Sequence, residues 1–129
     1  MPFRAPVYEY TFLFENVVDY SVLTTTEKFQ DATSDMVDAI LTEAGRLCED
    51  VMYPVQRNGD IDPARLENGV VRTSKGFAEA YRAIADGGWV STSASPEYGG
   101  MGLPLTVTTA VNEMMAAACL SLQLNPLMT

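Results

Sequence analysis

The side chains that could do acid–base or nucleophilic chemistry here are carboxylates, tyrosines, lysines and cysteines, because the sequence contains no histidine. A Ser-His-Asp triad, a Cys-His pair and an HExxH zinc site are therefore excluded. The two cysteines, Cys48 and Cys119, are too few for a disulfide framework and lack the spacing of metal ligands. We expect both to be buried, reduced thiols.

Two sets of carboxylates are candidates for a site. Glu113 lies beside Asn112 in the most apolar segment of the chain, where a carboxylate would be suited to act as a base. A place at the edge of a helix is the more common use of such a residue. Residues 27–67 contain ten acids against four bases, but the twelve-residue calcium loop with its closing Glu is absent. We expect a solvated acidic face and no metal site.

A glycine-rich stretch, Gly99-Gly100-Met101-Gly102, precedes the start of a predicted helix, where free N–H groups could cradle a phosphate. The Walker pattern fails because no Gly-Lys-Ser/Thr follows. The dinucleotide pattern fails because the glycine spacing is wrong and no convincing strand precedes the loop. We expect a tight turn that brings helices close together.

The composition bounds the function classes. The chain has 129 residues, 47% of them hydrophobic, and a net charge of −9, with no Lys or Arg after Arg82. Such a chain is globular and long enough for one domain, and it is repelled by nucleic-acid phosphates and anionic lipids. The first residues lack the pattern of a secretory signal, and the stretch 105–124 is too polar for membrane insertion. We expect a soluble, cytoplasmic protein.

The strongest periodicity predicts an amphipathic helix that begins near Thr33 or Ser34, either of which could cap it. Pro54 predicts a kink or an early end, and Gly59 in Arg57-Asn58-Gly59-Asp60 predicts a left-handed stop. The apolar positions repeat at three- and four-residue steps: Met36, Val37, Ile40, Leu41, Ala44, Leu47, Cys48, Val51, Met52 and Val55.

Shorter helices are predicted on both sides of this one. A helix over 8–19 has Phe12, Leu13, Val17 and Tyr20 along one side, and Thr24 to Glu27 fits a capping box. Residues 58–72 are predicted to be a surface loop.

A further helix, capped by Thr73 or Ser74, is predicted to end at Gly87-Gly88. After a loop over 91–103, Pro104 opens a nearly all-apolar helix that Asn125-Pro126 interrupts. No convincing strand is present, so the predicted fold class is all-α, an up-and-down helical bundle.

The order of three motifs resembles the N-terminal helical domain of the acyl-CoA dehydrogenase family. Gly88-Trp89 comes first, the Pro-Glu-Tyr-Gly-Gly-Met-Gly loop of residues 96–102 follows, and Asn112-Glu113 matches a helical Asn-Glu or Glu-Glu. The stretch 51–60 is similar to an earlier helix of that domain. Residues 8–20 resemble the N-terminal extension of a larger bacterial subgroup. The resemblance implies an extension over 1–30 and an incomplete helical domain over 31–129, truncated before a β-sandwich domain.

The resemblance also implies an activity. Family members bind FAD and desaturate acyl-CoA thioesters between the α and β carbons, with a carboxylate removing the α-proton while the β-hydride passes to the flavin. That carboxylate and most flavin contacts belong to the middle and C-terminal parts of the family's subunit. This chain alone is thus expected to be inactive and not to retain FAD. The implied partners are the remaining domains, a second copy in a homo-oligomer, and electron-transfer flavoprotein as the acceptor.

The resemblance places two residues of this chain in a site. The segment after Glu113, around Leu122 and Gln123, matches the part of the family that lines the acyl pocket. No catalytic or metal-binding residue is implied. Substrates in the larger subgroup include fatty acyl-CoA and, in some marine bacteria, methylthiopropionyl-CoA. The alternative function is a non-catalytic helical interaction or oligomerisation module that docks its apolar C-terminal helix on a partner.

Overall fold

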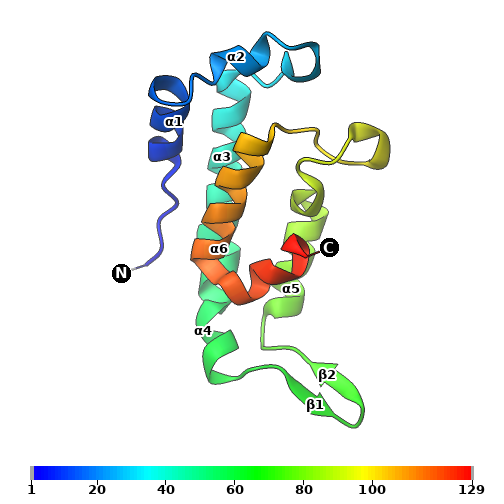
Figure 1. Ribbon diagram of the computed structural model, residues 1–129. Helices are drawn as coiled ribbons and strands as arrows, with labels where there is room; N and C mark the ends of the chain where they lie inside the picture. Colours follow the sequence, from blue (N-terminus) through cyan, green and yellow to red (C-terminus); the bar gives the residue numbers. More distant parts are fainter. Residues whose placement is uncertain (1, 129) are drawn as a thin grey trace.

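The computed structural model describes residues 2–128, and most of them are helical. In Figure 1 the chain runs up through α1 (Val7–Asn16), down through α3 (Ser34–Leu47) and α4 (Tyr53–Ile61), up through α5 (Phe77–Asp86) and down through α6 (Leu105–Leu127). Apart from α3 and α4, which continue in one direction, these helices alternate in direction, as the all-α up-and-down bundle predicts.

Residues 34–61, which comprise α3, α4 and the turn between them, form one long helical rod at the back of the molecule. Thr33 caps α3 as predicted, and its hydroxyl accepts a hydrogen bond from the N–H of Met36 at 3.4 Å. Between α3 and α4 lies one π-helical turn, η2 (Cys48–Met52), in which the N–H of Tyr53 donates to the carbonyl of Cys48. The expected kink or early end at Pro54 is therefore replaced by a wider turn. We attribute the turn to Pro54, which lacks an N–H and crowds the carbonyl four residues before it.

The rod also continues past its predicted stop. Gly59 keeps a right-handed backbone, and α4 ends at Ile61. The reason for this glycine is packing, because a Cβ atom on Gly59 would lie 2.9 Å from the ring of Phe77 and 3.2 Å from Oγ of Ser121. Gly59 thus lets α4 approach α5 and α6 closely.

A β-hairpin occupies the stretch that was expected to be a loop without strands. Strands β1 (Arg65–Glu67) and β2 (Val70–Arg72) pair antiparallel, with Leu66 opposite Val71. Asn68 and Gly69 join them with φ values of 52° and 78°. Two left-handed residues in a two-residue connection are typical of a type I′ hairpin turn, for which Asn-Gly is preferred.

The start of α5 differs from its prediction. Gly76, with φ of 86°, occupies the N-cap position, so neither Thr73 nor Ser74 caps the helix with its side chain. The carbonyl of Ser74 instead accepts from the N–H of Phe77 at 3.1 Å. The helix ends at Gly87-Gly88 as expected, with Gly88 left-handed.

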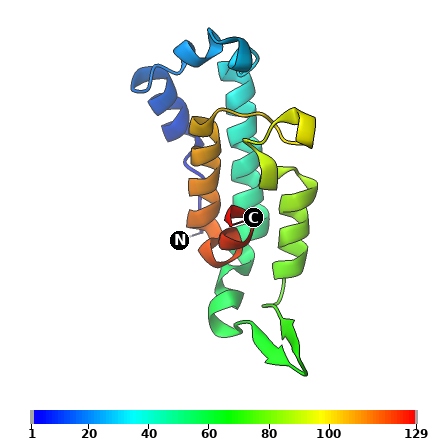
Figure 2. The same ribbon diagram turned by 45° about the vertical axis from the view of Figure 1, so that its right-hand side comes forward.

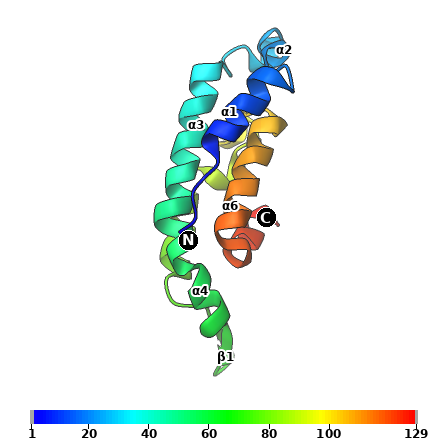
Figure 3. The same cartoon turned by 90° about the vertical axis from the view of Figure 1, so that its left-hand side faces the viewer.

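Residues 3–29 wrap one side of the rod (Figure 3). Glu49 holds their beginning, because its carboxylate accepts from the guanidinium of Arg4 at 2.7 Å and from the N–H of Ala5 at 2.9 Å. Beyond α1, the chain forms two short turns, α2 (Ser21–Thr24) and η1 (Glu27–Phe29). Thr24 does not cap η1, since its hydroxyl donates back to Ser21.

Of the apolar side predicted for the helix over 8–19, only Tyr20 is buried, and it lies beyond the end of α1. The structure buries Tyr10 and Tyr20, whereas Phe12, Leu13 and Val17 are exposed. The helix is short and its apolar residues are spread around it, so periodicity alone does not identify its inner face.

The last helix packs into the middle of the fold (Figure 2), where it contacts α3, η2 and α4. Pro104 is its N-cap, and its first residue is Leu105. It bends at Cys119, which has φ of −159° and ψ of 86°. The interruption was expected at Asn125-Pro126, and the bend lies seven residues before Pro126. By length and composition alone α6 could cross a membrane, but half of the qualifying window is buried inside the chain. Such burial is typical of the core helix of a bundle.

Candidate functional site

The bend in α6 creates the most unusual local geometry near the residues assigned to the acyl pocket. In Figure 1 the helix runs down beside α3 and then turns toward α5. Cys119 at the bend is fully buried, and Ser121 Oγ lies 3.7 Å from its sulfur. The turn places Ser121 beside Gly59 of α4 instead of extending the helix away from the bundle.

Leu122 and Gln123 both point into the protein, with exposed fractions of 2% and 1%. The amide nitrogen of Gln123 donates to Oδ1 of Asn112 at 3.0 Å, across the bend. Its carbonyl oxygen is buried and has no hydrogen-bond donor within the described part of the chain. A buried amide oxygen left in this state costs free energy, so a donor from outside these residues would be favoured there.

A groove of about 780 Å³ runs along the outer side of the same segment. Its walls combine aromatic, apolar and charged groups from two helices. Leu120 and Leu124 line it from α6 and are exposed. The α4 side contributes Tyr53, Pro54, Gln56, Arg57, Gly59 and Asp60. Leu122 and Gln123 do not line this groove. Beyond the bend, Leu122 and Gln123 thus point inward, whereas Leu120 and Leu124 face outward.

The glycine-rich stretch is a closed turn, as expected. Each N–H from Gly99 to Leu103 donates to a backbone carbonyl of residues 91–96, at 2.9 to 3.1 Å. A Cβ atom on Gly100 would lie 2.1 Å from the carbonyl oxygen of Ala94, so the turn requires glycine at this position. Because all five donors are used, the turn does not offer a cradle for phosphate.

Glu113 lies on the exposed side of α6, at the edge of the helix rather than in an apolar pocket. Its carboxylate lies close to Tyr10 of α1. Burial, and then this nearby carboxylate, raise the pKa of Tyr10. This position favours the structural interpretation of Glu113 over a base.

The two cysteines are buried thiols, as predicted. Burial, followed by the charge of Glu49, raises the pKa of Cys48 to about 12. Both effects keep the nucleophilic thiolate scarce at neutral pH. Within residues 2–128, no cluster of acids and cysteines has the arrangement of a metal site.

One further pocket was not predicted from the sequence. It lies between α1 and α3 and includes Tyr20, whose buried hydroxyl has no hydrogen-bond partner among residues 2–128. No spacing pattern signals it, because its residues come from three separate segments.

Comparison with known proteins agrees with the resemblance drawn from the motifs. Residues 34–129 match the sequence model of a family described as acyl-CoA dehydrogenase, N-terminal domain. The match begins at the first residue of α3. Over all its 129 residues the chain is 36% identical to a protein of Ruegeria pomeroyi named 3-methylmercaptopropionyl-CoA dehydrogenase. The chain spans 22% of the length of that relative.

Proposed function

The chain belongs to the acyl-CoA dehydrogenase family, and from this premise we propose that it forms the N-terminal helical part of an FAD-dependent enzyme that desaturates acyl-CoA thioesters. The observation that carries the proposal is the family match over residues 34–129, which covers the rod, α5 and α6. The desaturation takes place between the α and β carbons of the acyl group.

The contribution of this chain would be a wall of the acyl pocket. Leu122 supplies apolar surface, and Gln123 supplies a buried carbonyl oxygen that lacks a donor among the described residues. Apolar walls with a few fixed polar groups are typical of small-molecule sites. The hydrogen bond to Asn112 fixes the amide of Gln123, so its free oxygen has one defined orientation.

The residues described here do not fit FAD. The five N–H groups of residues 99–103 are already used, and no Lys or Arg follows Arg82 to meet the pyrophosphate. We infer that other parts of the full-length protein hold the flavin and the catalytic carboxylate. On this proposal the 129-residue chain alone is inactive and colourless.

The visible spectrum of the protein expressed from its complete reading frame tests the proposal. A yellow protein that is bleached by an acyl-CoA under anaerobic conditions would support it. The substrate arms compare 3-methylmercaptopropionyl-CoA, suggested by the name of the 36% identical relative, with butyryl-CoA and octanoyl-CoA. A protein that takes up no FAD and converts none of the three thioesters would contradict the proposal.

The role of Gln123 has its own test in that full-length protein. Gln123→Leu should raise the KM for acyl-CoA. It removes the unpaired oxygen and also the hydrogen bond to Asn112, so the free energy of unfolding should change little. Asn112→Leu removes the group that orients the Gln123 amide and should raise the KM less, whereas Gln30→Leu, at an exposed residue before α3, is the matched control and should leave the KM unchanged. An unchanged KM in Gln123→Leu would remove Gln123 from the acyl pocket.

The alternative is a non-catalytic helical interaction or oligomerisation module. The exposed leucines of the bent segment, Leu120, Leu124 and Leu127, favour it because they form apolar surface without cover. In this case the full-length protein would be colourless and would bind a partner through residues 120–127.

The same proposal extends to partners and location. Electron-transfer flavoprotein would accept the electrons, the enzyme would be a homo-oligomer, and it would act in the cytoplasm without insertion into the membrane. Reduction of added electron-transfer flavoprotein by the substrate-treated enzyme is the measurement that tests the acceptor.

A further inference from the structure

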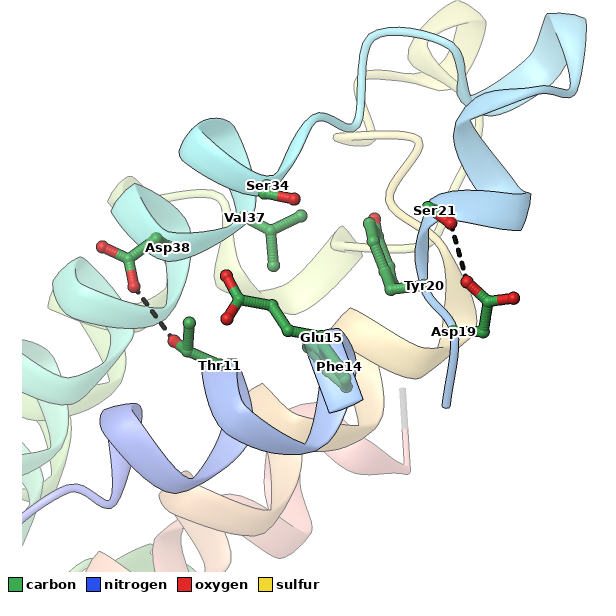
Figure 4. A pocket seen from close by; sticks show the side chains of 9 residues that line it. All are labelled: Thr11, Phe14, Glu15, Asp19, Tyr20, Ser21, Ser34, Val37 and Asp38. Atoms are coloured by element: carbon green, nitrogen blue, oxygen red, sulfur yellow. Dashed lines mark hydrogen bonds between the residues drawn. The ribbon is translucent and has the colours of Figure 1, made fainter. Parts of the chain in front are cut away.

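A small pocket far along the rod from the bend has a distinct chemical lining. It has a volume of about 180 Å³ and lies where α1, residues 19–21 and the start of α3 meet (Figure 4). Phe14 and Tyr20 form its aromatic part, with ring centroids 5.4 Å apart and an angle of 25° between the rings. Val37 adds apolar surface, and the remaining lining residues are acids and hydroxyl-bearing residues.

The hydroxyl of Tyr20 is the feature that points to a missing ligand. Tyr20 is 4% exposed, lines the pocket, and its buried oxygen has no hydrogen-bond partner within residues 2–128. Buried hydroxyls are almost always paired, and an unpaired one costs free energy. A donor that enters the pocket would satisfy it.

The carboxylates around the pocket point to the charge of that donor. Glu15, Asp19 and Asp38 line it, and none of them forms an ion pair with a Lys or Arg of the described chain. Asp38 accepts one hydrogen bond from Thr11 at 3.0 Å, and Asp19 accepts one from Ser21 at 2.7 Å. Figure 4 shows the carboxylate of Glu15 beside Val37, without a dashed line to any neighbour.

We propose that this pocket binds a guanidinium group, held by Glu15 and the hydroxyl of Tyr20 beside the aromatic pair of Phe14 and Tyr20. A guanidinium has N–H donors in a planar fork, carries a permanent positive charge, and stacks on aromatic faces. Those properties match the carboxylates, the orphan hydroxyl oxygen and the paired rings. The carboxylates do not form a cluster with the arrangement of a metal site, which favours an organic cation over a metal ion.

The first experiment uses the isotope-labelled 129-residue chain and follows amide NMR shifts as a ligand is added. The probe is N-acetyl-arginine methylamide, and its neutral match is the citrulline analogue, in which an oxygen replaces one guanidinium nitrogen. The arginine probe should shift the amides of residues 11–21 and 34–38 with a dissociation constant on the order of 1 mM. The citrulline analogue should bind at least about tenfold more weakly.

A second ligand separates the two sources of a guanidinium. Free arginine differs from the blocked probe by an α-carboxylate, which the acidic lining repels, and an α-ammonium, which a peptide-bonded arginine lacks. Tighter binding of the blocked probe would identify an arginine side chain of a protein, and equal binding of free arginine would identify a small metabolite.

Two conservative variants test the named groups. Tyr20→Phe should weaken binding of the arginine probe at least about tenfold, the effect of one lost hydrogen bond to a charged donor. The same variant should leave the thermal midpoint unchanged or raised, because it removes an unpaired oxygen. A hydroxyl with only a structural role would lower stability without changing affinity. Glu15→Gln should weaken binding about tenfold.

Matched controls come from the same helix. Tyr8 and Glu9 are exposed on α1 and do not line the pocket, so Tyr8→Phe and Glu9→Gln should leave the affinity unchanged. The proposal is overturned if the citrulline analogue binds as tightly as the arginine probe. It is equally overturned if the shifts lie outside the pocket, or if Glu9→Gln weakens binding as much as Glu15→Gln. Activity of the full-length enzyme is not a readout here, so failure of this proposal is distinct from failure of the proposed function.

Discussion

Gly99 and Gly100 are adjacent, but the structure favours glycine at the two positions for different reasons. Gly100 has the carbonyl oxygen of Ala94 only 2.1 Å from where its Cβ would lie, whereas Gly99 has φ of 80° and open space around it. We predict that Gly100→Ala lowers the free energy of unfolding by about 3 kcal/mol, because backbone must move. Gly99→Ala should cost about 1 kcal/mol, since only the left-handed backbone is strained. Urea unfolding of both variants measures the difference.

Equal losses in the two variants would show that the turn is not packed as closely as Gly100 requires. A larger loss in Gly99→Ala would reverse the assignment. The pair is informative because both residues lie in the same short turn, so effects on the unfolded chain nearly cancel.

The buried thiols lead to a prediction about reactivity. Burial raises the pKa of Cys48 to about 12, so almost no thiolate forms near pH 8. In the folded chain, Cys48 should therefore resist alkylation by iodoacetamide, as measured by intact mass, and Cys119 should resist it because its side chain is fully buried. In urea both should react fully. Rapid labelling of one cysteine under native conditions would show that its surroundings open on the timescale of the reaction.

At the scale of elements, periodic sequence was the reliable guide. The long helix from Ser34 was predicted because its apolar residues repeat at helical steps over five turns, and its cap at Thr33 is a standard one. The π turn was not predicted, since Pro54 signals only that a regular α-helix is unfavourable there. Whether the chain stops, kinks or widens depends on what packs against it.

The candidate site was likewise predicted only in part from the sequence. Its apolar character was visible in the sequence around Leu122, but the bend at Cys119 was not, because no proline or glycine marks that residue. The bend brings Ser121 onto α4, where Gly59 leaves room, and that contact joins residues far apart in the sequence. The hydrogen bond between Gln123 and Asn112 depends on the bend and was equally invisible.

The hairpin was missed although Asn68-Gly69 is a strong turn signal. All six of its strand residues are exposed, so neither strand has the alternation of a half-buried strand. An isolated two-stranded hairpin is marginally stable in water. We predict that Gly69→Ala, at φ of 78° with open space around it, unfolds the hairpin without changing the thermal midpoint of the chain.

Hydrogen exchange tests this directly. Amides of residues 65–72 should exchange faster in Gly69→Ala, and those of α3 should be unaffected. A lowered thermal midpoint would show that the hairpin is coupled to the bundle.

At the scale of the whole molecule, Glu49 joins the N-terminal segment to the rod. The N–H of Ala5, followed by the charge of Arg4, lowers the pKa of Glu49 below its usual value. A lowered folded-state pKa stabilises the protein above the unfolded pKa, and this contribution is lost as pH falls through the folded one. We predict that Glu49→Gln costs up to about 1 kcal/mol at pH 7, because the pair is partly exposed.

The cost of Glu49→Gln should shrink as the solution becomes acidic, which urea unfolding at several pH values would measure. Glu43→Gln is the control, since Glu43 in α3 pairs with Arg46 on the surface of the same rod without holding another segment. A cost for Glu49→Gln that is independent of pH would mean that the carboxylate charge is not what holds residues 3–7 in place.

The π turn at Cys48–Met52 has a consequence for how the chain tolerates changes in length. A π turn takes in about one residue more than an α turn. The rod can therefore gain or lose one residue at this turn without rotating α4 about the helix axis. A homologous chain one residue shorter at this turn could coil as an unbroken α-helix and still point Gly59 at Phe77 and Ser121. Removal of a residue elsewhere in the rod would rotate everything beyond it by about 100°. Single-residue length variation should therefore concentrate at this one turn.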